Sequence, residues 1–243
     1  MKLKVASLFL LLFSISTARA QNWGGGVDDD DIHFGFTFQY VGSEFKVLRK
    51  AEWRNPYVDP EFGPDSASLR SISSKSSPGF GIGFVVNKRL SEHADLRFTP
   101  ILVFNDRILS YSYTSVNMDV EKKTSATLVE FPLGFKLKSD RRNNFRAYVL
   151  GGGKYSVDIS SKKKSNNNLI TDPAEKLVNN KRSYFSYEAG FGFDLYFEYF
   201  KMSPEIKLSY SLNNLLKDEP LHRYTTPIDK LMLRHVTFSL FFE

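Results

Sequence analysis

Charged residues at alternate positions are the first places in this sequence where chemistry could occur. Seven lie on the polar side of segments in which apolar and polar residues alternate: Arg97, Glu130, Lys136, Glu188, Asp194, Glu205 and Lys207. Successive side chains of a strand point to opposite faces, so within each segment these charges share one face. Such a set could form a catalytic cluster, an ion conduit or a structural network of ion pairs. We expect the network, because buried charges must be paired.

Other catalytic and metal-binding patterns are weak. The four histidines, His33, His93, His222 and His235, lie on separate segments without the close spacing of a metal site. The chain has no cysteine, and it lacks a Gly-x-Ser-x-Gly motif. His222, together with serines of other loops, could serve a lipid-modifying enzyme, but that alternative rests on residue type alone. We therefore expect no enzymatic activity, no cofactor and no metal.

The N-terminus predicts export from the cytoplasm. Lys2 and Lys4 precede an apolar run over residues 5–15, and small residues at positions 18 and 20 follow it, as in a secretory signal peptide. The run is too short for a transmembrane helix, which needs roughly 20 apolar residues. We expect cleavage between Ala20 and Gln21.

Composition is consistent with an exported β protein. The whole chain carries 33 Lys and Arg against 27 Asp and Glu. Three of the cations lie in the expected signal peptide, so the exported part is only mildly basic, which argues against nucleic acid as a partner. The 22 Phe and 12 Tyr suit strands and membrane interfaces.

Alternation with a period of two predicts strands rather than helices. We count eight strands, at about residues 32–41, 79–88, 94–104, 125–138, 145–156, 185–198, 201–212 and 232–242. The phase of the Gly-rich fifth segment is unclear, and the third segment could continue through Ile108, Ser110 and Tyr111. One side of these segments is rich in Phe, Tyr and Leu, and the other carries glycine and charge. Glycine suits a crowded, curved interior, and the aromatic side suits lipid.

The connections between these segments alternate in length. Long loops are expected at residues 42–78, 105–124, 157–183 and 213–231, and short turns at 87–93, 139–144 and 199–200. Outer-membrane barrels have this asymmetry, with long loops outside and short turns in the periplasm. The pattern predicts an all-β fold, an eight-stranded antiparallel up-and-down transmembrane β-barrel with both termini in the periplasm. Its interior would be only wide enough for side chains, so it would not conduct protein.

This prediction divides the chain into three parts. Residues 1–20 are the signal peptide, 21–31 a periplasmic linker, and 32–243 the barrel. The expected partners are outer-membrane lipid and lipopolysaccharide, with no small-molecule substrate. The first long loop is aromatic, with Trp53, Tyr57 and Phe62. It could fold over the barrel mouth or present a docking surface for a partner.

Several short blocks in a fixed order resemble a known family. They are Ile32–Phe36, Ser77–Phe80, Leu96–Pro100, Val129–Leu133, Tyr148–Gly152, Tyr187–Asp194 and Met202–Lys207. From about residue 30 onward the chain resembles the PorT family of outer-membrane β-barrels of Bacteroidetes. The resemblance implies a non-enzymatic role in protein export by the type IX secretion system, with other components of that system as partners. The alternatives are a barrel for adhesion or membrane integrity, or the lipid-modifying enzyme.

Overall fold

The structure is a computed structural model that describes residues 30–59, 63–64, 67–115, 118–160, 178–217 and 222–243. The expected signal peptide, the cleavage site at Ala20 and Gln21, and Phe62 of the aromatic loop lie outside these residues. Within the described part of the chain, no helix is long and apolar enough to cross a membrane.

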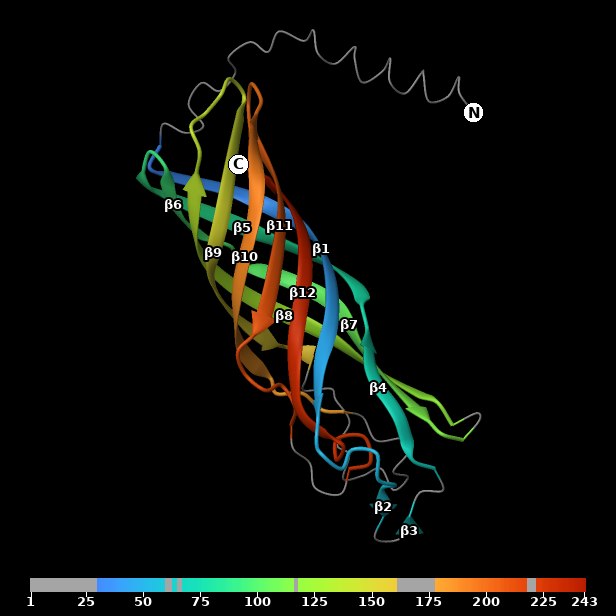
Figure 1. The fold of residues 1–243 in the computed structure, drawn as a ribbon. Coiled ribbons are helices and arrows are strands. Elements are labelled where there is room, and N and C mark those ends of the chain that lie inside the picture. Colours follow the sequence, from blue (N-terminus) through green and yellow to red (C-terminus); the bar gives the residue numbers. More distant parts are fainter. Residues whose placement is uncertain (1–29, 60–62, 65–66, 116–117, 161–177, 218–221) are drawn as a thin grey trace, which may run out of the picture.

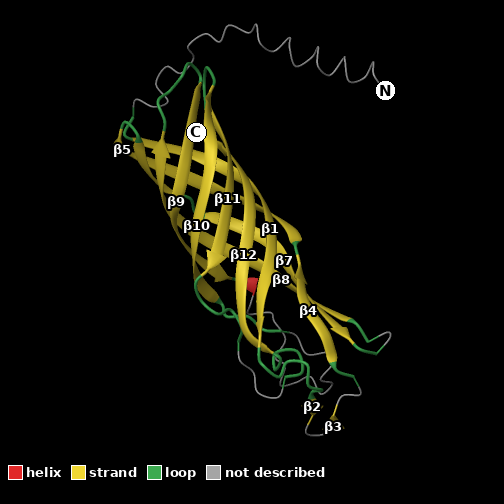
Figure 2. Cartoon of the chain, viewed as in Figure 1, coloured by secondary structure: helices red, strands yellow, loops and turns green. Residues whose placement is uncertain are grey.

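Strands dominate the described structure (Figure 2). In chain order they are β1 (Ile32–Arg49), β2 (Val58–Asp59), β3 (Gly63–Pro64), β4 (Leu69–Lys75), β5 (Ser77–Ser91), β6 (Ala94–Phe98), β7 (Ile101–Tyr113), β8 (Val120–Lys138), β9 (Phe145–Asp158), β10 (Ser183–Tyr196), β11 (Lys201–Ser211) and β12 (Ile228–Phe242). Only β2 and β3 stand apart, as a small two-stranded sheet.

The other strands form one antiparallel sheet that closes on itself (Figure 1). β1 pairs with β12 on one side and with β5 on the other, which closes the ring. The sheet contains 10 strands, but β4 runs on into β5 across Ser76, and β6 runs on into β7 across Thr99 and Pro100. Six unbroken strands and two interrupted ones therefore make eight wall strands. This confirms the predicted eight-stranded up-and-down barrel.

The interruption between β6 and β7 has a simple cause. Pro100 has no backbone N–H and cannot donate to a ladder. Backbone hydrogen bonds still join this stretch to both neighbouring strands. Phe84 N donates to the Pro100 carbonyl at 3.0 Å, and Thr99 N donates to the Pro132 carbonyl at 3.1 Å. The wall stays closed across the break.

Several strands are longer than the sequence predicts. The predicted loop over residues 105–124 is too long, because β7 continues to Tyr113 and pairs with β8 from Val120 onward. This confirms the continuation through Tyr111 that the sequence left open. Inward Leu109 and Tyr111 are buried there, while outward Ser110 is polar, because this part of the strand lies beyond the apolar wall. β1 likewise continues to Arg49.

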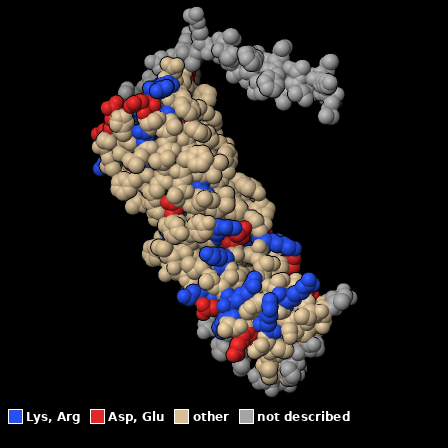
Figure 3. Space-filling view, in the orientation of Figure 1, with Lys and Arg blue, Asp and Glu red and all other residues tan. Residues whose placement is uncertain are grey.

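The outer wall of the barrel carries an apolar belt, and the face seen in Figure 3 shows few charged side chains over it. Phe34 and Phe84 are each 70% exposed, whereas the inward Thr37 and Ser43 are fully buried. The belt comprises Phe34, Phe36, Phe38, Phe80, Ile82, Phe84, Phe131, Leu133, Phe135, Leu137, Val149, Phe185, Phe191, Phe193, Ile206, Leu208, Val236 and Phe238. A surface this apolar is unusual for a protein in water and suits the hydrocarbon of a membrane.

The two ends of the barrel differ. The short turns, the start of β1 and the end of β12 lie at one end, the short-turn end. The longer connections lie at the other, the loop end, where charged side chains gather in Figure 3. Outward-facing Lys123 pairs with Asp106 at 2.8 Å, and Arg234 pairs with Glu44, beyond the belt. Such charges mark where the apolar wall ends on this side.

Candidate functional site

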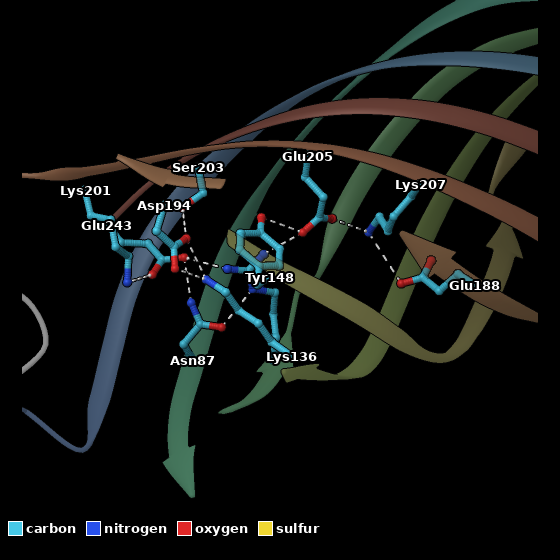
Figure 4. Close-up of polar contacts among 11 residues, drawn as sticks. Asn87, Lys136, Tyr148, Glu188, Asp194, Lys201, Ser203, Glu205, Lys207 and Glu243 are labelled. Atoms are coloured by element: carbon cyan, nitrogen blue, oxygen red, sulfur yellow. Dashed lines mark hydrogen bonds and ion pairs between the residues drawn. The ribbon is translucent and has the colours of Figure 1, made fainter. Parts of the chain in front are cut away.

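The interior toward the short-turn end is built around Arg97, whose partners Asn87, Glu205 and Glu243 are labelled in Figure 4. This guanidinium comes from β6 and points across the barrel. It donates to Glu205 Oε2 on β11 at 2.9 Å and to Glu243 Oε1 at 3.2 Å, and its Nε donates to Asn87 Oδ1 on β5 at 2.8 Å. One buried side chain thus joins strands from opposite sides of the ring.

Figure 4 also shows a second set of contacts, which involves Lys136, Asp194 and Ser203. Lys136 Nζ donates to both carboxylate oxygens of Asp194 at 2.7 Å, and the Ser203 hydroxyl donates to the same carboxylate at 2.6 Å. Lys201 Nζ lies 2.7 Å from Glu243 Oε2. Each charge is therefore held by an opposite charge.

The network continues toward the middle of the barrel. Lys207 Nζ lies 3.4 Å from Glu188 Oε1 and 3.6 Å from Glu205 Oε1, so it bridges two carboxylates. Lys154 Nζ pairs with Glu130 Oε2 at 2.9 Å. All of these side chains are buried. Breaking such a pair by removing one partner costs about 3–5 kcal/mol.

The structure places all seven charges singled out in the sequence inside the barrel. Each lies within ion-pair distance of an opposite charge. The sequence reasoning missed other members of the network: Asn87, Asp95, Lys138, Tyr148, Lys154, Lys201, Glu243 and His235. Alternation could have found Asp95, which lies two residues before Arg97 on the same strand face. Lys154 was obscured because glycines hide the phase of its segment.

The loop end of the interior is closed by apolar packing. Leu215, Leu231 and Leu128 are fully buried there. The Tyr111 hydroxyl donates to the Tyr224 carbonyl at 2.9 Å, and the two rings lie 5.1 Å apart. The described parts of the connection between β11 and β12, residues 212–217 and 222–227, therefore fold back into the mouth. Their buried side chains Leu215, Leu216 and Tyr224, with the strand residues packed against them, form what we call the apolar plug.

His222 belongs to this plug. It is 1% exposed, and its Nδ1 accepts hydrogen bonds from the backbone N–H of Tyr224 at 3.2 Å and of Thr225 at 3.3 Å. These two hydrogen bonds show that the His222 side chain stabilises the turn at residues 222–225. Among the described residues, no group of His, Cys, Asp and Glu could hold a metal ion.

Trp53 and Tyr57 of the aromatic loop line a pocket at the barrel mouth. The pocket has a volume of about 410 Å³. Trp53 also packs against the apolar plug. The loop therefore folds against the mouth and still leaves a recess, which we call the mouth pocket.

These features define a class of protein. A closed antiparallel barrel with an apolar outer belt and an ion-paired interior is a transmembrane β-barrel. Residues 19–217 match the family model described as outer membrane protein beta-barrel domain. The chain belongs to that family and is an outer-membrane β-barrel protein.

Solved structures of similar proteins are distant. The outer membrane protein OprG from Pseudomonas aeruginosa is 11% identical, with a TM-score of 0.44, and the match covers 87% of this chain and 92% of that one. The attachment invasion locus protein Ail of Yersinia pestis is 12% identical, with a TM-score of 0.36, covering 88% and 99%. No curated protein matches the chain.

Proposed function

We propose that this barrel is a non-enzymatic component needed for protein export by the type IX secretion system. In this proposal it acts through its loops, turns or outer wall, and it is not the export pore. The observation that supports a non-conducting role is the filled interior. Ion pairs around Arg97 occupy one half, and the apolar plug occupies the other.

The resemblance of the ordered sequence blocks to the PorT family supports the export role. In this proposal the short-turn end and both termini face the periplasm, and the loop end faces the outside. Partners among the secretion components would then bind the turns from within or the loops from without. Lipid and lipopolysaccharide would surround the apolar belt.

A gene deletion tests this proposal. Loss of the protein should leave export cargo in the periplasm with its signals unprocessed, and the wild-type gene on a plasmid should restore surface cargo. Fractionation and immunoblotting of cargo would measure this. Normal surface cargo in the deletion strain would contradict the export role.

The second candidate is a barrel for adhesion or membrane integrity. The mouth pocket with its aromatic residues favours it, since a recess at the loop end could contact a surface ligand. This candidate predicts intact export in the deletion strain, together with reduced surface binding or greater sensitivity to detergent. The lipid-modifying enzyme predicts an altered lipid A mass spectrum on deletion, which His222→Ala should reproduce.

A further inference from the structure

The wall of the barrel is open along one short stretch at the loop end. β1 pairs with β5 up to the pair Ser43 and Ser77. Beyond it, β1 pairs only with β12, and β4 pairs only with β7. Figure 1 shows β4 diverging from β1 here. We call this opening, between residues 44–49 and 69–75, the seam.

Side chains bridge the seam where a backbone ladder would otherwise lie. The Ser74 hydroxyl accepts a hydrogen bond from Phe45 N at 2.9 Å and donates to the Ile108 carbonyl at 2.8 Å. Arg49 donates to the Ile72 carbonyl at 3.0 Å. Strand edges are templates for pairing with another chain unless something covers them. Here two side chains, Ser74 and Arg49, cover part of the edges, and no strand pairs with either edge along the seam.

The seam lies beyond the apolar belt, on the aqueous side. Its outward neighbours are charged: Glu44 pairs with Arg234, and Lys75 pairs with Glu121. Backbone groups without partners are very costly in hydrocarbon. The position of the seam therefore excludes lipid tails as its occupant and leaves it accessible from water.

The seam ends in the mouth pocket. Lys50 follows β1 directly and Leu69 begins β4, and both line the pocket. Three aromatic side chains, Trp53, Tyr57 and Tyr113, form much of its wall. The volume of about 410 Å³ lies in the range of sites that bind a small molecule or a few side chains.

Charge around the mouth pocket is mainly positive. Lys50 and Arg223 line it, against the single carboxylate of Glu52. Arg49 adds a guanidinium whose Cζ lies 4.6 Å from the centre of the Trp53 ring. An occupant with carboxylates and an aromatic or apolar side chain complements this lining.

We propose that the seam and the mouth pocket together bind an extended, acidic segment of a partner polypeptide. The segment adds as a strand to the free edge of β4, where main-chain hydrogen bonds give affinity. An aromatic or apolar side chain enters the pocket beside Trp53, and carboxylates face Lys50 and Arg223. This inference does not depend on the export role.

The test uses the full barrel in lipid nanodiscs with the substitution Trp23→Phe, which leaves Trp53 as the sole tryptophan. The probe is a short synthetic peptide of alternating threonine and valine that carries one phenylalanine and two glutamates. One control peptide has proline at alternate positions and cannot form a ladder. A second has lysine in place of glutamate. Fluorescence of Trp53 reports binding, and hydrogen exchange reports the backbone of the seam.

We expect the acidic peptide to change Trp53 fluorescence and to slow amide exchange in residues 44–49 and 69–75. Lys50→Glu combined with Arg223→Glu should weaken binding about tenfold or more. Lys217→Glu, an exposed change at the loop end outside the pocket lining, is the matched control and should bind normally. A gel shift between heated and unheated samples confirms that each variant is folded.

Four results would overturn the proposal. Equal binding of the proline peptide, or binding without slower exchange at the seam, would show that no strand is added. No fluorescence change with any peptide would show that the pocket does not accept a peptide side chain. Binding of a free aromatic carboxylate with none of the peptides would assign the pocket to a small molecule instead.

Discussion

Arg97 is the residue on which most of the interior depends. It contacts partners on β5 and β11 and the side chain of Glu243, so its loss would leave more than one buried polar group with fewer partners. A buried ion pair gains little over an apolar pair of the same volume, but a broken one is strongly destabilising. The network therefore fills and closes the interior, but its presence is weak evidence that it raises the free energy of unfolding.

The substitution Arg97→Met tests this. We expect it to lower the free energy of unfolding by about 3–5 kcal/mol, because Glu205 loses its closest cationic partner. Urea unfolding in lipid vesicles, followed by the heat-dependent gel shift, measures the change. The double variant Arg97→Met with Glu205→Leu should recover part of the loss. A single variant as stable as the wild type would contradict the assigned role.

Two adjacent glycines on β9 give a matched pair of substitutions. A Cβ on Gly152 would lie 2.2 Å from the Leu133 carbonyl oxygen, whereas a Cβ on Gly151 would meet nothing within 4 Å. Gly152→Ala should therefore destabilise the barrel by at least about 1–3 kcal/mol through overpacking. Gly151→Ala should fold as the wild type does. Equal free energies of unfolding for both variants in the same urea assay would show that β8 and β9 lie farther apart at Gly152 than in the structure.

At the scale of elements, alternation predicted seven of the eight wall strands, because each places apolar side chains on one face and polar side chains on the other. The Gly-rich β9 was counted as a strand although its phase was unclear. The outer ends of β1 and β8, which leave the membrane, were missed, and the outer end of β7 was only left open. There Tyr111 faces inward and Ser110 outward, and no apolar outer face signals a strand. The interruption at Pro100 was not predicted, although a proline within a strand cannot donate to the ladder.

Only some features of the candidate sites could be predicted from the sequence. Inward charges could be recognised by their phase, but which charges meet depends on barrel closure. Arg97 and Glu205 lie 108 positions apart in the chain and on opposite sides of the ring. The seam could not be predicted either, because it depends on the register at which β1 stops pairing beyond Ser43. The mouth pocket depends in turn on where the seam ends.

The hairpin of β7 and β8 carries a testable ion pair at its outer part. The hydrogen bond from the Lys75 ammonium lowers the pKa of the Glu121 carboxyl below its ordinary value. A carboxyl with a lowered pKa contributes stability above its unfolded pKa and loses it as the pH falls through the folded pKa. The pair should therefore persist to a pH below the ordinary range of glutamate titration.

An NMR titration of the Glu121 carboxyl carbon in micelles measures this effect. We expect a midpoint below the ordinary glutamate value in the wild type, and a return toward that value in Lys75→Met. Lys123→Met, which removes a lysine of the hairpin itself that pairs with Asp106, serves as the control and should leave the Glu121 midpoint low. Identical midpoints in the wild type and Lys75→Met would contradict the pairing of β4 with this hairpin.

At the scale of the whole molecule, the barrel is closed in two different ways. Ion pairs fill the half near the short turns, and the apolar plug fills the half near the loops. The apolar belt fixes the barrel in the membrane. The surfaces left for recognition are therefore the turns, the loop end with its seam and mouth pocket, and the outer wall.

Single-channel recording tests the closed interior most directly. Purified full-length protein in a planar lipid bilayer should give no discrete conductance steps, because among the described residues the ion network and the apolar plug occupy the two halves of the interior. A porin reconstituted in the same bilayer serves as the positive control. Stable, reproducible conductance steps from folded barrels would contradict the closed interior and would indicate that the interior takes part in the function.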